Sequence, residues 1–316
     1  MLWGTTYLVT TQFLPADRPI LVSVLRALPA ALLLLAGVAL LAGRLALPQG
    51  AWWWRALVLG TLNIGLFFPL LFVSAYRLPG GVAAVLTAVG PFMVAVLAFL
   101  FLRELPAGRA LAGATIGVGG VALLVLRSSV ALDSIGIAAA LLATASLALG
   151  MVLGRRWGAP TGYQRRITAL LALTAWQLAV GGLLLLPVAL LVEGMPPTLT
   201  GLNLAGFGFL SMAGTGLAYV LWFRGVTGGL GPTRVSVLTL LTPVVAAVLG
   251  WVVLAERLTA WQIVGALAVL GGVVLGASGG KPIGRPGWAR TASEQRPPSP
   301  RQPPEQRAPD ASPAGR

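Results

Sequence analysis

Long apolar runs separated by short polar connections fill most of the chain. Ten runs can be distinguished, at residues 1–14, 19–41, 56–76, 80–102, 107–126, 134–154, 168–192, 202–223, 230–254 and 260–276. A helix of about 20 apolar residues crosses a hydrocarbon core of roughly 30 Å, and most of these runs reach that length. No stretch of useful length alternates with the two-residue period of a strand. The pattern predicts an all-α integral membrane protein with ten transmembrane helices.

Composition excludes an ordinary soluble domain. Only 9% of the residues are charged and 57% are hydrophobic, whereas soluble domains carry about 25% charged residues. The chain has no histidine and no cysteine, and its eight carboxylates lie in connections, at span edges or near the C-terminus. Such a distribution cannot assemble a metal cluster or an embedded acid–base pair. We therefore expect no enzymatic activity, no catalytic or metal-ligating residue and no cofactor.

The two ends of the chain differ from its middle. Only 14 residues precede Pro15, and no basic segment or small-residue cleavage site of a signal peptide comes before residues 15–19. A full span needs about 20 residues, so the sequence is expected to start inside a helix. Residues 278–316 are rich in Pro, Arg, Gln and Ser. They are predicted to form a disordered cytoplasmic tail, because they contain too little apolar surface to offset the entropy of ordering.

Arginines are distributed unevenly between the connections of this chain, whose net charge is +14. The connections after the second, fourth, sixth and eighth spans hold Arg44, Arg55, Arg103, Arg109, Arg155, Arg156, Arg165, Arg166, Arg224 and Arg234. Those on the other side hold only Arg18, Arg77, Arg127 and Arg257. By the positive-inside rule, the chain is predicted to be a multi-pass protein of the plasma (inner) membrane with both termini in the cytoplasm. The basic tail is compatible with nucleic-acid binding, but anchoring near anionic membrane lipids explains its charge more simply, so we expect no nucleic-acid partner.

One phrase occurs twice in the sequence. "GPFMVAVLAFLFLREL" at 90–105 returns in similar form within "TPVVAAVLGWVVLAERL" at 242–258. A single shift of 152 residues also places Gly113 on Gly265 and Gly119–Gly120 on Gly271–Gly272. Five spans separate the copies, and because five is odd the second copy must cross the membrane in the opposite direction. The sequence therefore predicts two inverted-topology five-helix repeats, an architecture associated with secondary transporters.

The repeated Pro, Glu and Gly positions, the ending "LAERLTAWQIVGALAVLGGVVL" (254–275) and the opening "WGTT" (3–6) resemble the EamA-like family of the drug/metabolite transporter superfamily. The resemblance spans both halves, residues 1–127 and 133–277. It implies a secondary transporter of small metabolites, an exporter of amino acids or related compounds, that works by alternating access. A membrane scaffold or receptor and a flippase of a lipid-linked substrate are the alternatives. A homodimer is compatible with the pattern.

Pro91 and Pro243 lie near the middle of their predicted spans. A proline inside a helix lacks an N–H and clashes with the carbonyl four residues earlier, so these prolines free the carbonyls of Thr87 and Thr239. A free carbonyl inside a membrane needs protein or water as a partner, so both kinks are predicted to face the interior of the bundle. The sequence leaves open whether the two threonine–proline pairs contact the substrate or only shape helix packing.

Glu104 and Glu256 each follow a span and precede the next helix. A carboxylate there is stabilised by the positive end of the helix dipole, and Thr259 is placed to cap the last helix. We interpret these residues as structural. Because the repeat is inverted, the two glutamates would lie on opposite faces of the membrane and could also help to close opposite gates.

Further polar or aromatic side chains interrupt the spans. Some of Asn63, Thr144, Ser146, Gln177, Ser211, Thr215 and Tyr219 are expected to line a substrate pathway. Asn63 and Gln177 are the sharpest candidates because an amide is costly against lipid, although such groups more often bond to a neighbouring helix. Phe67, Phe68, Tyr219 and Trp222 supply either aromatic walls or interfacial anchors, which are the commoner use of aromatic residues near span ends. Arg26 lies inside the second span and is expected to reach the membrane surface with its long side chain.

Overall fold

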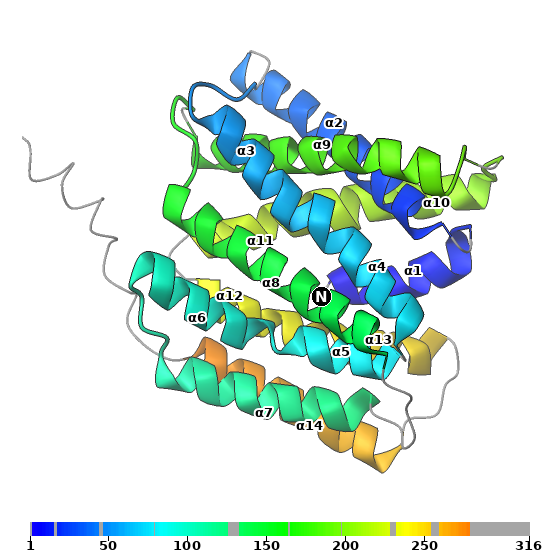
Figure 1. The fold of residues 1–316 in the computed structure, drawn as a ribbon, viewed down its shortest axis with the longest axis vertical. Coiled ribbons are helices and arrows are strands. Elements are labelled where there is room, and N and C mark those ends of the chain that lie inside the picture. Colours follow the sequence, from blue (N-terminus) through cyan, green and yellow to red (C-terminus); the bar gives the residue numbers. More distant parts are fainter. Residues whose placement is uncertain are drawn as a thin grey trace, which may run out of the picture. The chain divides into compact units, whose positions relative to one another are not determined.

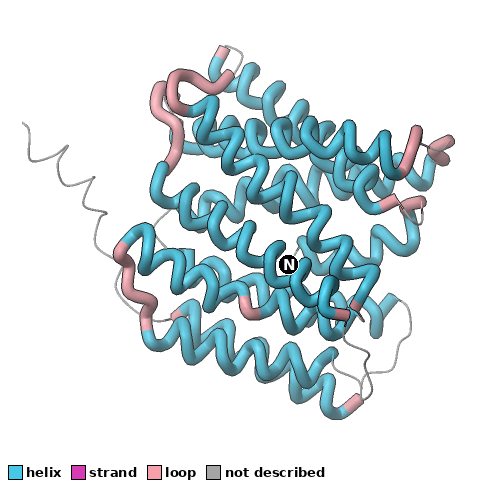
Figure 2. The backbone as a smooth tube through the Cα atoms, in the orientation of Figure 1, coloured by secondary structure: helices cyan, strands magenta, loops and turns pink. Residues whose placement is uncertain are grey.

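The structure is a computed structural model. It describes residues 2–15, 18–43, 47–78, 80–125, 133–163, 165–196, 198–227, 232–253 and 259–278. Within these residues all regular secondary structure is helical, and they contain no strand (Figure 2). Glu256 and the predicted tail beyond Ser278 lie outside the described residues.

The helices follow one another along the chain with short connections (Figure 1). The first part contains η1 (Leu2–Gly4), α1 (Thr5–Phe13), α2 (Pro19–Ala42), α3 (Trp52–Gly60), η2 (Thr61–Leu66), α4 (Phe67–Arg77), α5 (Gly80–Ala88), α6 (Gly90–Leu102) and α7 (Gly108–Val125). The second contains α8 (Ser134–Trp157), α9 (Arg166–Val192), α10 (Gly201–Phe209), η3 (Leu210–Leu217), α11 (Ala218–Thr227), α12 (Pro232–Val237), η4 (Leu238–Leu240), α13 (Leu241–Val253) and α14 (Ala260–Ala277).

Eight helical segments of the described chain are long and apolar enough to cross a membrane. They are Pro19–Ala42, Trp52–Leu71, Ala83–Leu102, Ser134–Trp157, Arg166–Val192, Gly201–Val226, Pro232–Val253 and Ala260–Ala277. Large apolar side chains cover their outer surface, with Leu40 87% and Leu191 86% exposed. Such a surface suits lipid rather than water, so this is a multi-pass membrane protein. Of the two other predicted spans, α1 has nine residues, and α7 has 18, as many as α14.

Two spans are interrupted just before a proline. Helix α5 ends at Ala88, and α6 begins at Gly90 with Pro91 in its first turn. In the later span, the 3₁₀ segment η4 separates α12 from α13, which begins two residues before Pro243. The missing N–H of each proline is harmless in a first turn, where no partner exists for it. The helix interruptions predicted at the two prolines are therefore present.

Two other spans contain a π-helical segment. In η2 the wider turn carries Asn63, whose amide fills the space left by Gly150 on α8. The corresponding segment η3 joins α10 to α11. A π segment forms only where contacts from neighbouring helices compensate for its poorer hydrogen bonding. These contacts come from polar side chains described with the candidate site below.

Antiparallel helix pairs hold the described unit together. Gly120 of α7 lies against Gly265 of α14, and Gly113 lies against Gly272, so residue numbers rise along one helix as they fall along the other. A Cβ at Gly120 would lie 2.6 Å from the carbonyl oxygen of Gly265, which leaves no room for a larger residue. The helices can approach this closely only because glycine has no side chain. Figure 1 shows α7 and α14 side by side.

The second antiparallel pair is formed by α2 and α9. The Glu193 carboxylate, just after α9, accepts hydrogen bonds from the backbone N–H groups of Ile20 (2.8 Å) and Leu21 (2.7 Å) at the start of α2. Further along, Leu28 of α2 packs on Gly182 of α9. Glu193 thus satisfies two free N–H groups and places a negative charge at the positive end of the α2 dipole.

Side-chain caps fix three further helix starts, those of α8, α10 and α14. Thr259 and Gln262 form a capping box at α14, so the predicted Thr259 cap is confirmed. Asp133 caps α8 by accepting a hydrogen bond of 2.7 Å from the Gly136 N–H. That bond is the main reason why the pKa of Asp133 lies below its usual value, and the nearby Arg77 lowers it further.

Candidate functional site

A cavity of about 650 Å³ lies within the described unit. Its wall is mainly apolar and includes Leu71, Val94, Leu147, Ala148 and Met151. The side chains with polar groups in the wall are Trp3, Arg26, Thr87, Thr144, Tyr219, Ser236, Thr239, Thr242 and Gln262. Small-molecule sites typically occupy about 300–1,000 Å³ and combine an apolar wall with a few convergent polar groups. The described residues contain no group of three or more carboxylate, histidine or cysteine side chains that could hold a metal ion.

Both proline-associated interruptions contribute to the cavity wall. Thr87 and Gly90 come from the first interruption, and Thr239 and Pro243 come from the second. The Thr87 hydroxyl donates to the carbonyl oxygen of Ala83 at 3.0 Å, and that of Thr239 donates to the carbonyl oxygen of Ser236 at 2.6 Å. Each hydroxyl oxygen keeps lone pairs with which it can accept a hydrogen bond from a bound molecule.

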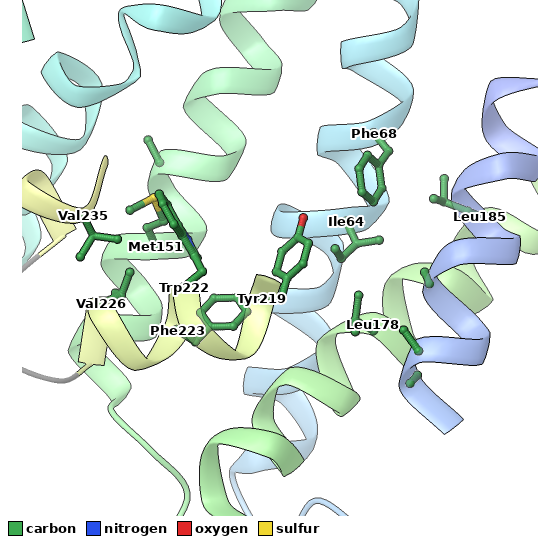
Figure 3. Close-up of a cluster of buried hydrophobic side chains, with 14 of the residues drawn as sticks. Ile64, Phe68, Met151, Leu178, Leu185, Tyr219, Trp222, Phe223, Val226 and Val235 are labelled. Atoms are coloured by element: carbon green, nitrogen blue, oxygen red, sulfur yellow. The ribbon is translucent and has the colours of Figure 1, made fainter. Parts of the chain in front are cut away.

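Aromatic side chains cover part of the wall. The Trp3 ring packs edge-on against Tyr219, with ring centroids 5.4 Å apart. Its centroid also lies 5.0 Å from that of Trp222. Tyr219 on α11 and Phe68 on α4 belong to the same buried cluster, in which the Tyr219 hydroxyl points away from its own helix (Figure 3). Phe67, Phe68 and Tyr219 therefore line the cavity in this structure and are not interfacial anchors.

Arg26 is the one charged side chain in the wall of this cavity among the described residues. It is only 6% exposed. Its Nε donates to Thr215 Oγ1 at 3.0 Å, and its guanidinium carbon lies 4.9 Å from the centroid of the Phe68 ring. The expectation that Arg26 reaches the membrane surface is wrong. It lies about 10 Å along α2 from Pro19, and the packing of α2 on η3 and α4 directs it inward.

The other predicted pathway residues occupy different places. Thr87, Tyr219, Thr239 and Pro243 line the cavity, whereas Asn63, Pro91, Ser146, Gln177, Ser211 and Thr215 are not part of its wall. The Asn63 amide donates to Gln177 Oε1 at 2.6 Å, which joins η2 to α9. The Ser146 hydroxyl donates to the carbonyl oxygen of Leu62 at 2.8 Å. These bonds between helices hold the π segment η2 in place, the commoner use of polar groups in a membrane.

The second π segment is held in a similar way. The Ser211 hydroxyl donates to the carbonyl oxygen of Leu25 on α2 at 3.2 Å, and Thr215 receives the hydrogen bond from Arg26. Three polar wall residues, Ser236, Thr242 and Gln262, were not singled out from the sequence. Their side chains carry no signal that separates them from other polar residues in spans.

Glu104 has a different partner from the one expected. It lies outside the first turn of α7, which begins at Gly108, and so does not cap that helix. Instead its Oε1 lies 3.6 Å from Nε of Arg155, at the end of α8, with only 14% and 8% of the two side chains exposed. Among the described residues, the carboxylates that cap helices are Glu193, at the start of α2, and Asp133, at the start of α8. The Glu104–Arg155 ion pair joins α6 to α8 at one end of the bundle.

The cavity extends toward the opposite end of the bundle from this ion pair. Leu124, in its wall, lies about 24 Å along α7 from Gly108, since an α-helix rises about 1.5 Å per residue. Gln262, also in the wall, is in the first turn of α14, which the antiparallel packing places beside the end of α7. The cavity therefore reaches toward the end of α7 near Leu124, and the Glu104–Arg155 ion pair lies at the opposite end of the bundle.

Comparison with known proteins bears directly on this arrangement. The model of the EamA-like transporter family matches residues 1–126 and 134–277. The chain belongs to that family. This EamA-like transporter is 42% identical over 273 residues to protein PecM of Dickeya dadantii, covering 86% of this chain and 88% of PecM. It is 27% identical over 226 residues to a probable amino-acid metabolite efflux pump of Salmonella typhimurium, covering 69% and 74% of the two chains.

A solved crystal structure shares the fold of the EamA-like transporter. The TM-score is 0.72 at 18% sequence identity, and the match covers 87% of this chain and 93% of that one. The resemblance to EamA-like members of the drug/metabolite transporter superfamily is thus confirmed, and the chain is a transporter of small molecules.

Proposed function

We propose that this EamA-like transporter exports a small organic metabolite, an amino acid or a related compound, by alternating access between two inverted five-helix halves. The observation that carries the proposal is the shared cavity, whose wall contains a proline-associated helix interruption from residues 1–127 and another from residues 133–277. Alternating access places the substrate between two such halves, at discontinuous helices. The outward direction is supported by the name of the Salmonella relative, an efflux pump.

The glycine contacts of α7 and α14 support the inverted repeat. The shift of 152 residues carries Gly113 onto Gly265 and Gly120 onto Gly272. It therefore exchanges the Gly113–Gly272 contact with the Gly265–Gly120 contact. Contacts that exchange with each other in this way are the signature of a two-fold axis. The π segments η2 and η3, at Thr61–Leu66 and Leu210–Leu217, also correspond at nearly the same spacing.

The arginine distribution orients the proposed transporter with its termini in the cytoplasm. A reporter active only in the cytoplasm is therefore expected to work when fused after Arg156 and to fail when fused after Glu193. Arg156 lies in the last turn of α8, before α9 (Arg166–Val192) begins, and Glu193 directly follows α9, so one membrane crossing separates them. Activity only after Glu193 would reverse the orientation, and equal activity at both sites would show that α9 does not cross.

Removing either interruption is expected to impair transport without preventing insertion. Pro91→Ala and Pro243→Ala supply an N–H and remove the ring that prevents the preceding helix from continuing, which favours a continuous helix and misaligns the cavity wall. We expect efflux of the transported metabolite to fall at least tenfold, with the membrane-inserted amount unchanged. The measurement compares metabolites released into the medium by cells that produce equal amounts of each variant.

Pro187→Ala is the matched control. Pro187 lies inside α9, is exposed and does not line the cavity. Its replacement is expected to leave efflux near that of the parent protein. If all three variants export normally, the interruptions are packing features. If the parent protein releases no metabolite above cells that lack it, the export proposal fails and the scaffold or flippase alternatives gain support.

A further inference from the structure

We infer that Arg26 is an anion-binding residue and that the cavity takes an organic acid with an apolar or aromatic body. This inference rests on the proposed function, because it narrows the substrate of the same cavity from amino acids and related compounds to organic acids without an ammonium group. Arg26 is 94% buried, at 6% exposure, yet belongs to the cavity wall. A cation inside a membrane protein is costly unless it has a counter-charge, and it marks a functional site by default.

The described part of the chain offers Arg26 no counter-ion. It contains three carboxylates, Glu104, Asp133 and Glu193. Glu104 is paired with Arg155, Asp133 is paired with Arg77, and Glu193 binds the start of α2. None of the three belongs to the cavity wall. A negative charge brought by the substrate would neutralise Arg26 without any rearrangement of these contacts.

Two neighbouring side chains fix the orientation of the Arg26 guanidinium in the cavity wall. Thr215 Oγ1 accepts from Nε at 3.0 Å and so fixes one corner of the planar group. The Phe68 ring, 4.9 Å from the guanidinium carbon, stabilises the cation through its face. Among the described residues, Thr215 is the only hydrogen-bond acceptor of Arg26. An arginine has five N–H donors in a rigid fork that matches a carboxylate, so the remaining donors suffice for a two-bond contact.

The other side chains of the cavity wall indicate the chemistry of the rest of the ligand, beyond its carboxylate. Trp3, Phe67, Phe68 and Tyr219 supply aromatic surface, and Leu147 with Met151 supplies aliphatic and thioether surface. Hydroxyls such as those of Thr144 and Thr239 can orient neutral polar groups. The described wall has no carboxylate for an ammonium group. It therefore favours a simple carboxylate over a zwitterionic amino acid of the same size.

Binding of matched acids and amides tests this inference. The full chain in lipid nanodiscs is titrated by calorimetry with phenylacetate and phenylacetamide, with hexanoate and hexanamide, and with phenylalanine, using empty nanodiscs as the blank. We expect each acid to bind at least tenfold more tightly than its amide, and phenylacetate at least tenfold more tightly than phenylalanine. Amides have the same shape as the acids, so the difference reports the charge.

Variants separate anion binding from a structural role. Arg26→Gln is expected to abolish the preference for acid over amide while the amide still binds, and Arg26→Lys is expected to keep part of it because the charge remains but the fork is lost. Arg109→Gln, at an exposed arginine on α7, is the control and should match the parent. A purely structural Arg26 would instead weaken acid and amide equally and lower the melting temperature.

Two results would overturn the inference. One is the absence of saturable binding of either acid, and the other is an acid preference that survives in Arg26→Gln. If the parent protein exports a neutral or cationic metabolite in the efflux experiment, the inference fails while the proposed function stands. If no metabolite is exported but the acids bind through Arg26, the proposed function fails and the anion site stands.

Discussion

Gly120→Leu is expected to prevent recovery of folded protein, whereas Gly119→Leu is expected to leave recovery near that of the parent. A Cβ at Gly120 would lie 2.6 Å from the Gly265 carbonyl oxygen and 2.7 Å from the Val269 nitrogen. Both obstacles are backbone atoms, so α7 and α14 must separate along their whole contact. Overpacking a core typically costs about 1–3 kcal/mol, and a leucine against backbone belongs at or above the upper end of that range.

The adjacent glycine provides the control for this prediction. A Cβ at Gly119 would meet nothing within 4 Å, and the residue is exposed on the outer face of α7. Both substitutions remove a glycine from the same helix turn and add the same side chain. The measurement is the monodisperse fraction and the melting temperature of each variant in detergent. Equal losses would show that helix propensity or insertion, rather than the α7–α14 contact, controls folding.

Breaking the Glu104–Arg155 pair is expected to lower transport at least tenfold. Both side chains are mostly buried, and they join α6 to α8 beyond one end of the cavity. Breaking a buried ion pair by removing one member typically costs about 3–5 kcal/mol. Glu104→Gln should therefore weaken the contact between α6 and α8 on which the proposed transport cycle depends, and the exchange Glu104→Arg with Arg155→Glu should restore part of the activity. Efflux per inserted molecule is the quantity compared.

The exposed pair Arg77–Asp133 is the natural control. Its charged atoms are 3.3 Å apart, closer than those of the buried pair, but 45% and 37% of its side chains are exposed. Exposed ion pairs are screened by solvent and contribute little, so Arg77→Gln is expected to change efflux by less than about twofold. An equal effect of Arg77→Gln and Glu104→Gln would contradict the role given to the buried pair.

Features whose cause lies within a single helix could be predicted from the sequence. The interruptions near Pro91 and Pro243 follow from a missing N–H and a steric clash, which no tertiary contact removes. The Thr259 cap follows similarly, because its partner Gln262 is three residues away. Membrane crossing follows from the length and apolarity of the spans. In each case the cause lies within one turn or one helix of its effect.

Features that depend on the rotation of one helix against another could not be predicted. Arg26 faces the cavity because α2 packs on η3 and α4, and the sequence shows only that a charge lies inside a span. Glu104 meets Arg155 rather than the helix that follows it, because α6 lies beside α8. The π segment η2 is held by Ser146 and Gln177 from two other helices, so no local sequence pattern predicts it.

Access to a cavity residue from both sides of the membrane tests the central claim most directly. The chain has no cysteine, so Thr239→Cys places a single thiol in the cavity wall, and Thr174→Cys places one at a fully buried site outside it. Oriented proteoliposomes are treated with an impermeant thiol reagent from either face. Alternating access predicts that Thr239→Cys is modified from both faces, that saturating transported metabolite slows both reactions, and that Thr174→Cys is modified from neither. Modification of Thr239→Cys from one face only, at a rate that the metabolite does not change, would contradict the account.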